Sequence, residues 1–207
     1  MIFKKVLYTL ILGISVFPAF AKEVGCEKPT INVELSRLTP SYGSKSYPEL
    51  VQMCGGKNVL GCTLSKYGCE YQIKLNKKGC KQLDFICYPD DFQVYIVDDY
   101  PNGSCEYKAI RKHENFHVSA FQNFSPKAIE AYLTKCIDEE VQKKKIKSGE
   151  QIYMKCSSKT QAWMNRRIQD KNREIDSYKK YDPLYFSDCK NWKMHSWEIE
   201  AHLDMKD

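Results

Sequence analysis

Hydrophobic and polar residues alternate along several short stretches in the first half of the chain. A period of two places successive side chains on opposite faces, as in a half-buried β-strand. The pattern predicts strands over Thr30–Leu35, Tyr71–Leu75, Leu83–Tyr88 and Phe92–Val97. Turn-forming residues at Lys77-Lys78-Gly79 and Pro89-Asp90-Asp91 separate the later strands. Between Thr39 and Cys69 the chain is rich in Gly, Ser, Pro and Cys, and we expect an irregular, disulfide-pinned segment there.

In the second half the apolar spacing changes to three and four, the period of amphipathic helices. Ser104 is a suitable N-cap, and Pro126 suits the first turn of the next helix. The pattern predicts helices over about Ser104 to Asn123, Ser125 to Ser148, Glu150 to Tyr181 and Trp192 to Met205. Strands followed by helices predict an α+β fold, with a small mixed sheet ahead of a helical C-terminal part.

The first of these helices carries the chemistry that stands out most. His113, Glu114 and His117 form an HExxH element, and both His lie on the apolar stripe of the helix. Residues four apart share one helix face, so the two imidazoles can bind one metal ion. A carboxylate next to the first His can act as a general base toward water at that metal. The element therefore predicts a zinc hydrolase site with Glu114 as the catalytic base.

The beginning of the chain and its cysteines predict an exported protein. Residues 1–21 combine Lys4 and Lys5, an apolar run too short for a comfortable membrane span, and a small-residue cleavage site at Ala21. We therefore expect a signal peptide over 1–21 and a single domain over 22–207, without stable membrane insertion after cleavage. All 10 Cys follow residue 21, and the sequence contains no Cys-x-x-Cys pair. Disulfides in a secreted or periplasmic protein are the expectation, with connectivity left open.

Charge adds little to this picture. The formal net charge is +6, and the densest basic run, 143–147, falls late in a predicted helix. Such runs are typical of solvated helix faces, and no nucleic-acid motif accompanies this one. A peptide or protein substrate is therefore favoured over a nucleic-acid partner.

Three segments in order carry a family resemblance: Leu60-Gly-Cys-Thr63, Tyr71-Gln-Ile-Lys-Leu75 and His113-Glu-Asn-Phe-His117. The chain resembles the zincin metallopeptidases, in which a mixed sheet precedes the HExxH helix and the edge strand of the sheet binds peptide. It is also similar to a group of exported bacterial zinc-dependent proteases, in which a later helix ends in a Tyr-Asp-type motif. Asn172-Arg-Glu-Ile-Asp-Ser-Tyr178 stands at that place. The resemblance implies an exported zinc metallopeptidase.

A catalytic zinc needs three protein ligands and one open position. The resemblance implies Asp176 as the third ligand beside His113 and His117. The sequence alone leaves Glu139, Glu140, His195 and His202 open as alternatives. Tyr178 or Tyr181 could donate a hydrogen bond to a developing oxyanion. Two other functions also stay open: a non-catalytic exported Cys-rich protein with a structural or vestigial HExxH, and a zinc amidase acting on cell-wall peptides.

Overall fold

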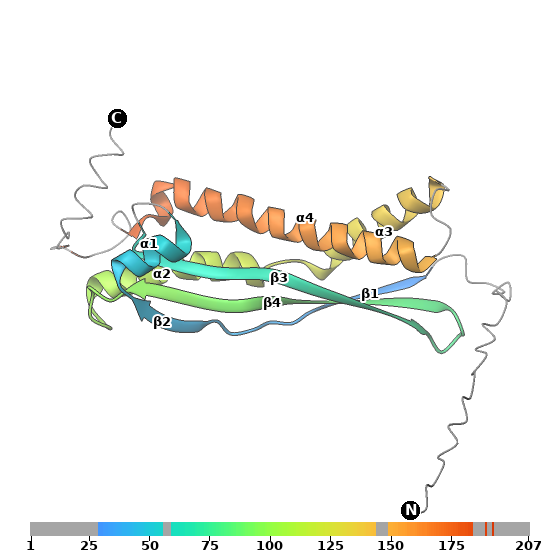
Figure 1. Cartoon of the computed structure of the whole chain (residues 1–207), viewed down its shortest axis with the longest axis horizontal. Helices are drawn as coiled ribbons and strands as arrows, with labels where there is room; N and C mark the ends of the chain where they lie inside the picture. The colour runs from blue at the N-terminus through green and yellow to red at the C-terminus, as the bar shows by residue number, and fades with distance from the viewer. Residues whose placement is uncertain (1–28, 56–58, 144–148, 184–188, 190–191, 193–207) are drawn as a thin grey trace, which may run out of the picture.

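The computed structural model describes residues 29–55, 59–143, 149–183, 189 and 192 (Figure 1). The strands are β1 (Thr30–Leu35), β2 (Ser41–Lys45), β3 (Gly61–Leu75) and β4 (Lys81–Val97). The helices are α1 (Tyr47–Cys54), α2 (Cys105–Gln122), α3 (Pro126–Gln142) and α4 (Gly149–Ser177), followed by a 3-10 turn, η1 (Lys179–Tyr181). The predicted α+β class is confirmed. The expected signal peptide and, apart from Trp192, the expected fourth helix lie outside the described residues.

β4 is the central strand of a mixed sheet. β1 and β2 both run parallel to it along one side, with Thr30 opposite Gln82 and Ser41 opposite Gln93. β3 runs antiparallel along the other side and pairs with β4 over nearly its whole length. No other strand of the described chain pairs with β3, so its outer side is a sheet edge.

The structure corrects the turn predicted at Pro89-Asp90-Asp91, because β4 runs through it without a break. The chain bends there instead. Asp91 has a φ of 49°, and the pairing with β3 shifts between Leu64 and Lys66, as at a β-bulge. Proline is tolerated at this point because Pro89 lies between the parts of β4 that pair with β1 and with β2, where no ladder N–H is needed.

The irregular segment predicted between Thr39 and Cys69 is also wrong, since it contains β2, α1 and half of β3. A capping box begins α1, in which the Glu49 carboxylate accepts a hydrogen bond from the Ser46 backbone N–H at 2.9 Å. The Cys54–Cys62 disulfide then ties the end of α1 to β3. The Ser-x-x-Glu spacing that signals this helix is present in the sequence.

The helix that carries HExxH begins as predicted. The Ser104 side chain accepts a hydrogen bond from the Tyr107 backbone N–H at 3.0 Å, which confirms the N-cap. α3 begins at Pro126, as predicted, and ends at Gln142. α4 ends at Ser177, earlier than predicted, because Tyr178 has an extended backbone before η1 begins.

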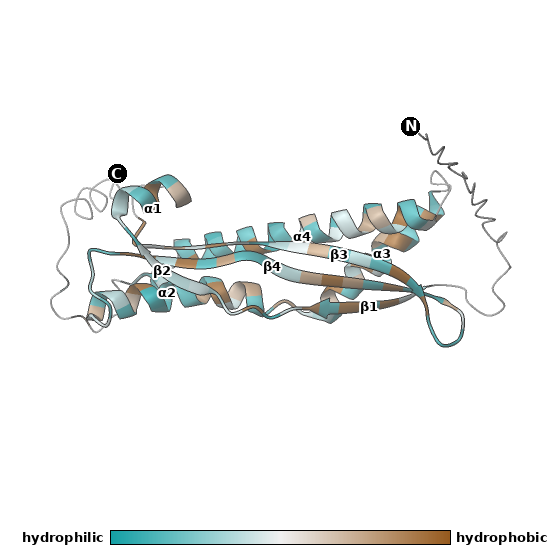
Figure 2. Cartoon of the chain, turned by 60° about the horizontal axis from the view of Figure 1, so that its bottom comes forward, coloured by the Kyte–Doolittle hydropathy of each residue, from teal (hydrophilic) through white to brown (hydrophobic). Residues whose placement is uncertain are grey.

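The main core lies between the sheet and the helices α2, α3 and α4. It contains Phe85 and Val94 from β4, Phe121 from α2, Leu133 from α3 and Met164 from α4, all nearly inaccessible to solvent. Burying each of these side chains contributes about 1.5–3 kcal/mol. In Figure 2 hydrophilic and hydrophobic residues alternate along α4, as expected of a helix with one buried face.

Disulfides join elements throughout the fold, as predicted for the cysteines. They link Cys54 to Cys62, Cys69 to Cys87, Cys105 to Cys189 and Cys136 to Cys156, and Cys80 is also disulfide-bonded. No cysteine in the described part of the chain is free. None of the described helices combines the length and the hydrophobicity that crossing a bilayer requires.

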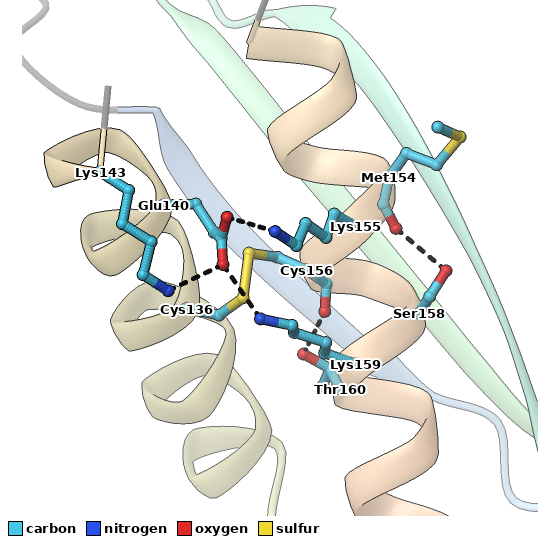
Figure 3. Close-up of a disulfide and its surroundings, with 9 residues drawn as sticks. All are labelled: Cys136, Glu140, Lys143, Met154, Lys155, Cys156, Ser158, Lys159 and Thr160. Atoms are coloured by element: carbon cyan, nitrogen blue, oxygen red, sulfur yellow. Dashed lines mark hydrogen bonds and ion pairs between the residues drawn. A yellow bond between two sulfur atoms is a disulfide. The ribbon is translucent and has the colours of Figure 1, made fainter. Parts of the chain in front are cut away.

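Helices α3 and α4 are held together by the Cys136–Cys156 disulfide and by an ionic cluster beside it (Figure 3). The Glu140 carboxylate accepts hydrogen bonds from the ammonium groups of Lys143, Lys155 and Lys159 at 3.1, 2.6 and 3.0 Å. These lysines lower the pKa of Glu140 to about 2. The cluster accounts for the acidic residue at a position that is 2% exposed.

Candidate metal centre

α2 places the two histidines of the HExxH element side by side. His113 and His117 lie one turn apart, and their Nε2 atoms are 3.1 Å from each other. His117 is buried and His113 is partly buried, on the side of α2 that meets α4 and η1. The predicted convergence of the two imidazoles is therefore present in the structure.

α4 brings the third predicted ligand to the same point. Asp176 Oδ1 lies 3.1 Å from His117 Nε2 and 3.5 Å from His113 Nε2. Within the described chain these three residues form a group whose donor atoms lie close enough to hold one metal ion. The Asp176 side chain is 61% exposed, so the group opens to solvent on that side.

The other ring nitrogen of each histidine contacts a different oxygen. His113 Nδ1 is 2.7 Å from the backbone carbonyl oxygen of Tyr181 in η1. Since a carbonyl oxygen only accepts hydrogen bonds, His113 Nδ1 carries the proton. His117 Nδ1 is 3.1 Å from Oδ1 of Asn172, one turn before Asp176 on α4, and donates to it in the same way. A carbonyl or amide oxygen on the second nitrogen is the usual outer partner of a metal-binding histidine.

This arrangement directs lone pairs toward one point. If Nδ1 carries the proton in both neutral rings, both Nε2 atoms present a bare lone pair, and these face each other and the Asp176 carboxylate. Three electron-rich atoms at such distances repel one another unless a cation or an extra proton lies between them. Tetrahedral zinc with ligands at 2.0–2.2 Å separates its ligand atoms by about 3.4 Å. The spacings of 3.1, 3.1 and 3.5 Å are close to that separation, so a small outward shift of the two histidine rings and the carboxylate would admit the ion.

The titration behaviour of the three groups reflects the same proximity. Burial alone would lower the pKa of His113 and His117, but the carboxylates of Asp176 and Glu114 outweigh it and raise both pKa values. The pKa of Asp176 moves in the opposite direction. Burial opposes ionisation, but the two imidazoles more than compensate, so the pKa of Asp176 lies well below its usual range. The group thus favours an ionised carboxylate facing positive charge.

Glu114 lies beside this group and makes different contacts. Its Oε2 accepts a hydrogen bond from the Thr63 hydroxyl of β3 at 2.7 Å, and its side chain is nearly fully buried. Burial raises the pKa of Glu114, which the two histidines only partly offset. Gly61 of β3 packs directly against the same carboxylate and leaves no room for a larger residue. Glu114 is therefore held at the side of the histidine pair by the edge strand.

Two of the alternative candidates for a third ligand, Glu139 and Glu140, lie away from the histidine pair. Glu140 binds three lysines beside the Cys136–Cys156 disulfide (Figure 3), and Glu139 is exposed on α3. His195 and His202 lie outside the described residues. Tyr181 reaches the site through its backbone carbonyl, and its ring packs on Phe116 with centroids 4.7 Å apart. An oxyanion role for Tyr178 or Tyr181 stays a prediction.

Sequence reasoning missed four contributors to this site: Gly61, Thr63, Asn172 and the Tyr181 carbonyl. Asn172 gives a readable signal, because it lies four residues before Asp176 and so shares its face of α4. Gly61 and Thr63 act through a contact between β3 and α2 that no local spacing reveals. The carbonyl of Tyr181 belongs to the backbone, so no residue type signals it.

Comparison of the chain with known protein families, with curated proteins and with solved structures gives no match. The geometry of the site is thus the basis for a functional assignment.

Proposed function

We propose that this protein is an exported zinc-dependent metallopeptidase in which His113, His117 and Asp176 hold the metal and Glu114 is the general base. The single observation that carries the proposal is the pair of imidazoles with both Nδ1 atoms engaged, which turns both Nε2 lone pairs toward Asp176. Two histidines and one carboxylate are a usual ligand set of catalytic zinc.

The exposure of Asp176 supports a catalytic rather than a structural metal. Structural zinc sites are closed by four protein ligands, whereas catalytic sites keep one position open. In the described part of the chain three candidate ligands converge, and the third of them, Asp176, is largely exposed. When bound, zinc supplies a Lewis acid that polarises a carbonyl and acidifies water. The residues of the chain then have to orient the substrate and move protons.

Glu114 has the position and the environment for proton transfer. Its carboxylate is buried next to both histidines, and burial raises its pKa, which makes it a stronger base than an exposed carboxylate. The Thr63 hydroxyl fixes one carboxylate oxygen. In this proposal Glu114 accepts the proton of the attacking water and returns it to the leaving amine.

The strand edge next to Glu114 supports a peptide as substrate. Thr63 belongs to β3, and no strand of the described chain covers the outer side of β3. An extended peptide can add to such an edge through main-chain hydrogen bonds. Export is supported by the disulfides, which are typical of proteins that fold in oxidising compartments.

Two variants with zinc analysis test the proposal. The protein after removal of residues 1–21 should contain about one zinc per chain and should hydrolyse peptides. Glu114→Gln should keep zinc and lose activity by about 10²-fold or more, because only the proton acceptor is removed. His117→Ala should lose both zinc and activity. Zinc without peptide hydrolysis would favour a binding role, and cleavage of cell-wall peptides alone would favour an amidase.

A further inference from the structure

The outward-facing residues of β3 can be identified from its pairing with β4. Cys69 and Cys87 are directly opposite and joined by a disulfide, with Cα atoms 4.1 Å apart. Such a short separation marks a pair whose backbone N–H and C=O groups point away from each other. At the other end, the Val97 N–H donates to the Leu60 carbonyl, so Leu60 faces β4. Odd-numbered residues of β3, from Gly61 to Cys69, therefore direct their backbone groups toward the outer edge.

The outward backbone groups of Tyr67 are occupied by side chains of α4. The Tyr67 N–H donates to Asn165 Oδ1 at 2.8 Å. Its carbonyl accepts from Asn165 Nδ2 at 3.2 Å and from Gln161 Nε2 at 3.0 Å. The Asn165 side chain thus accepts and donates hydrogen bonds as the backbone of a neighbouring strand would. Gln161, one turn earlier on α4, adds a second hydrogen bond to the same Tyr67 carbonyl. The sheet edge is closed at Tyr67 by a helix.

The closure lies close to the proposed reaction centre. Thr63 contacts Glu114, and Tyr67 follows four residues later, about 13 Å along an extended strand. α2 runs in the same direction, since the Tyr67 hydroxyl donates to the carbonyl of Phe121, beyond His117. A peptide paired with Gly61, Thr63 and Ser65 thus passes the histidines and meets α4 after about three residues.

We propose that Gln161 and Asn165 limit substrate length on one side of the cleaved bond, so that the enzyme acts on peptides with a chain end within about three residues of that bond. This inference rests on the proposed peptidase function. It makes α4 a specificity element as well as the carrier of Asp176. One end of the substrate is stopped by α4, and the other end leaves the strand edge at Gly61, where β3 begins.

Two series of synthetic peptides test the length limit. The cleaved bond is first located by digesting a random peptide library with the zinc-loaded protein and sequencing the products. A peptide containing that bond is then extended with Gly residues on its N-terminal side in one series and on its C-terminal side in the other. We expect kcat/KM to fall by about 10-fold or more in one series once more than about three residues are present, because a longer peptide leaves buried polar groups unpaired. The other series should not show this fall.

The double variant Gln161→Ala/Asn165→Ala tests whether these side chains set the limit. It should relieve the fall for long peptides, whereas Arg166→Ala, an exposed change on the same helix, should leave the limit as in wild type. An unchanged limit in a folded double variant would overturn the assignment to these residues. If the double variant does not fold, the wild-type series decides alone.

The outcomes for the wild-type protein separate the two proposals. Efficient cleavage of both series at every length would overturn the length limit and leave the peptidase function standing. No cleavage of any peptide by a protein with confirmed zinc content would overturn the peptidase function, and the inference with it.

Discussion

Gly61 is the point at which the sheet edge meets the proposed general base, and replacing it with alanine tests that contact. A Cβ atom at position 61 would lie 2.7 Å from Oε1 and 2.9 Å from Cγ of Glu114, and 2.9 Å from Cγ2 of Ile110. All three distances are shorter than carbon tolerates. Glu114 is 2% exposed and Ile110 is fully buried, so neither side chain has free space to move into.

The expected loss of stability follows from this crowding. Adding a methyl group to a well-packed interior typically costs about 1–3 kcal/mol, because side chains leave their rotamers or the backbone shifts. We also expect a loss of activity, because the crowding displaces the Glu114 carboxylate. A displacement of about 1 Å in a catalytic group can lower the rate by about 10²-fold. The three proposed ligands are untouched, so the zinc content of Gly61→Ala should stay near one per chain.

The assay combines chemical denaturation, zinc analysis and peptide hydrolysis on Gly61→Ala and a matched control. Gly68→Ala lies on the same strand, but its Cβ would meet the ring of Tyr88 at 3.1 Å, away from Glu114. The control should keep activity close to wild type. Full activity and unchanged stability in Gly61→Ala would refute the close contact between β3 and Glu114. Loss of zinc together with activity would mean that α2 moves as a whole, and that Glu114 is not displaced by itself.

Two further predictions concern Asp176 and Glu140. Asp176→Ala should weaken zinc binding by at least about 100-fold in a chelator competition assay, because two imidazoles alone hold zinc poorly. The control Glu139→Ala should bind zinc as the wild type does. The reverse result would assign the third ligand to Glu139. Because the pKa of Glu140 is about 2 in the fold against an ordinary 4.5, the free energy of unfolding gained from its ionisation is complete above pH 4.5 and is lost as the pH falls toward 2. Denaturation at pH 7 and pH 3 should show a smaller loss for Glu140→Gln than for wild type, and an equal loss would contradict the role of the lysine cluster.

Local spacing was enough to predict α2, α3, α4 and half of the site. Ser104 caps α2 and Pro126 opens α3 because both signals depend on neighbouring backbone groups alone. The approach of His113 to His117 follows from helix geometry in the same way. The prediction of Asp176 as a ligand rests on the family resemblance, and in the structure its carboxylate lies next to both histidines. Its role as a ligand stays a prediction.

The errors lie where tertiary structure overrides a local signal. Pro89-Asp90-Asp91 has the composition of a turn, yet β4 continues through it because Pro89 falls between two short strands that share one side of β4. That arrangement depends on β1 and β2 lying end to end, which no window of the sequence contains. The same holds for the contact of Gly61 with Glu114, since 53 residues separate them along the chain.

The orientation of α4 is the long-range feature on which the site depends. Ile168 and Ile175 are 4% and 2% exposed and lie seven residues apart, so both mark the buried face of α4. Asn172 stands between them on that face, and Asp176 follows Asn172 by four residues. A slip of one residue in the packing of α4 would turn the helix by about 100°, which would expose Ile175 and move the Asn172 and Asp176 side chains away from His117. Burial of two isoleucines therefore fixes the rotation at which α4 presents a carboxylate to the histidines of α2.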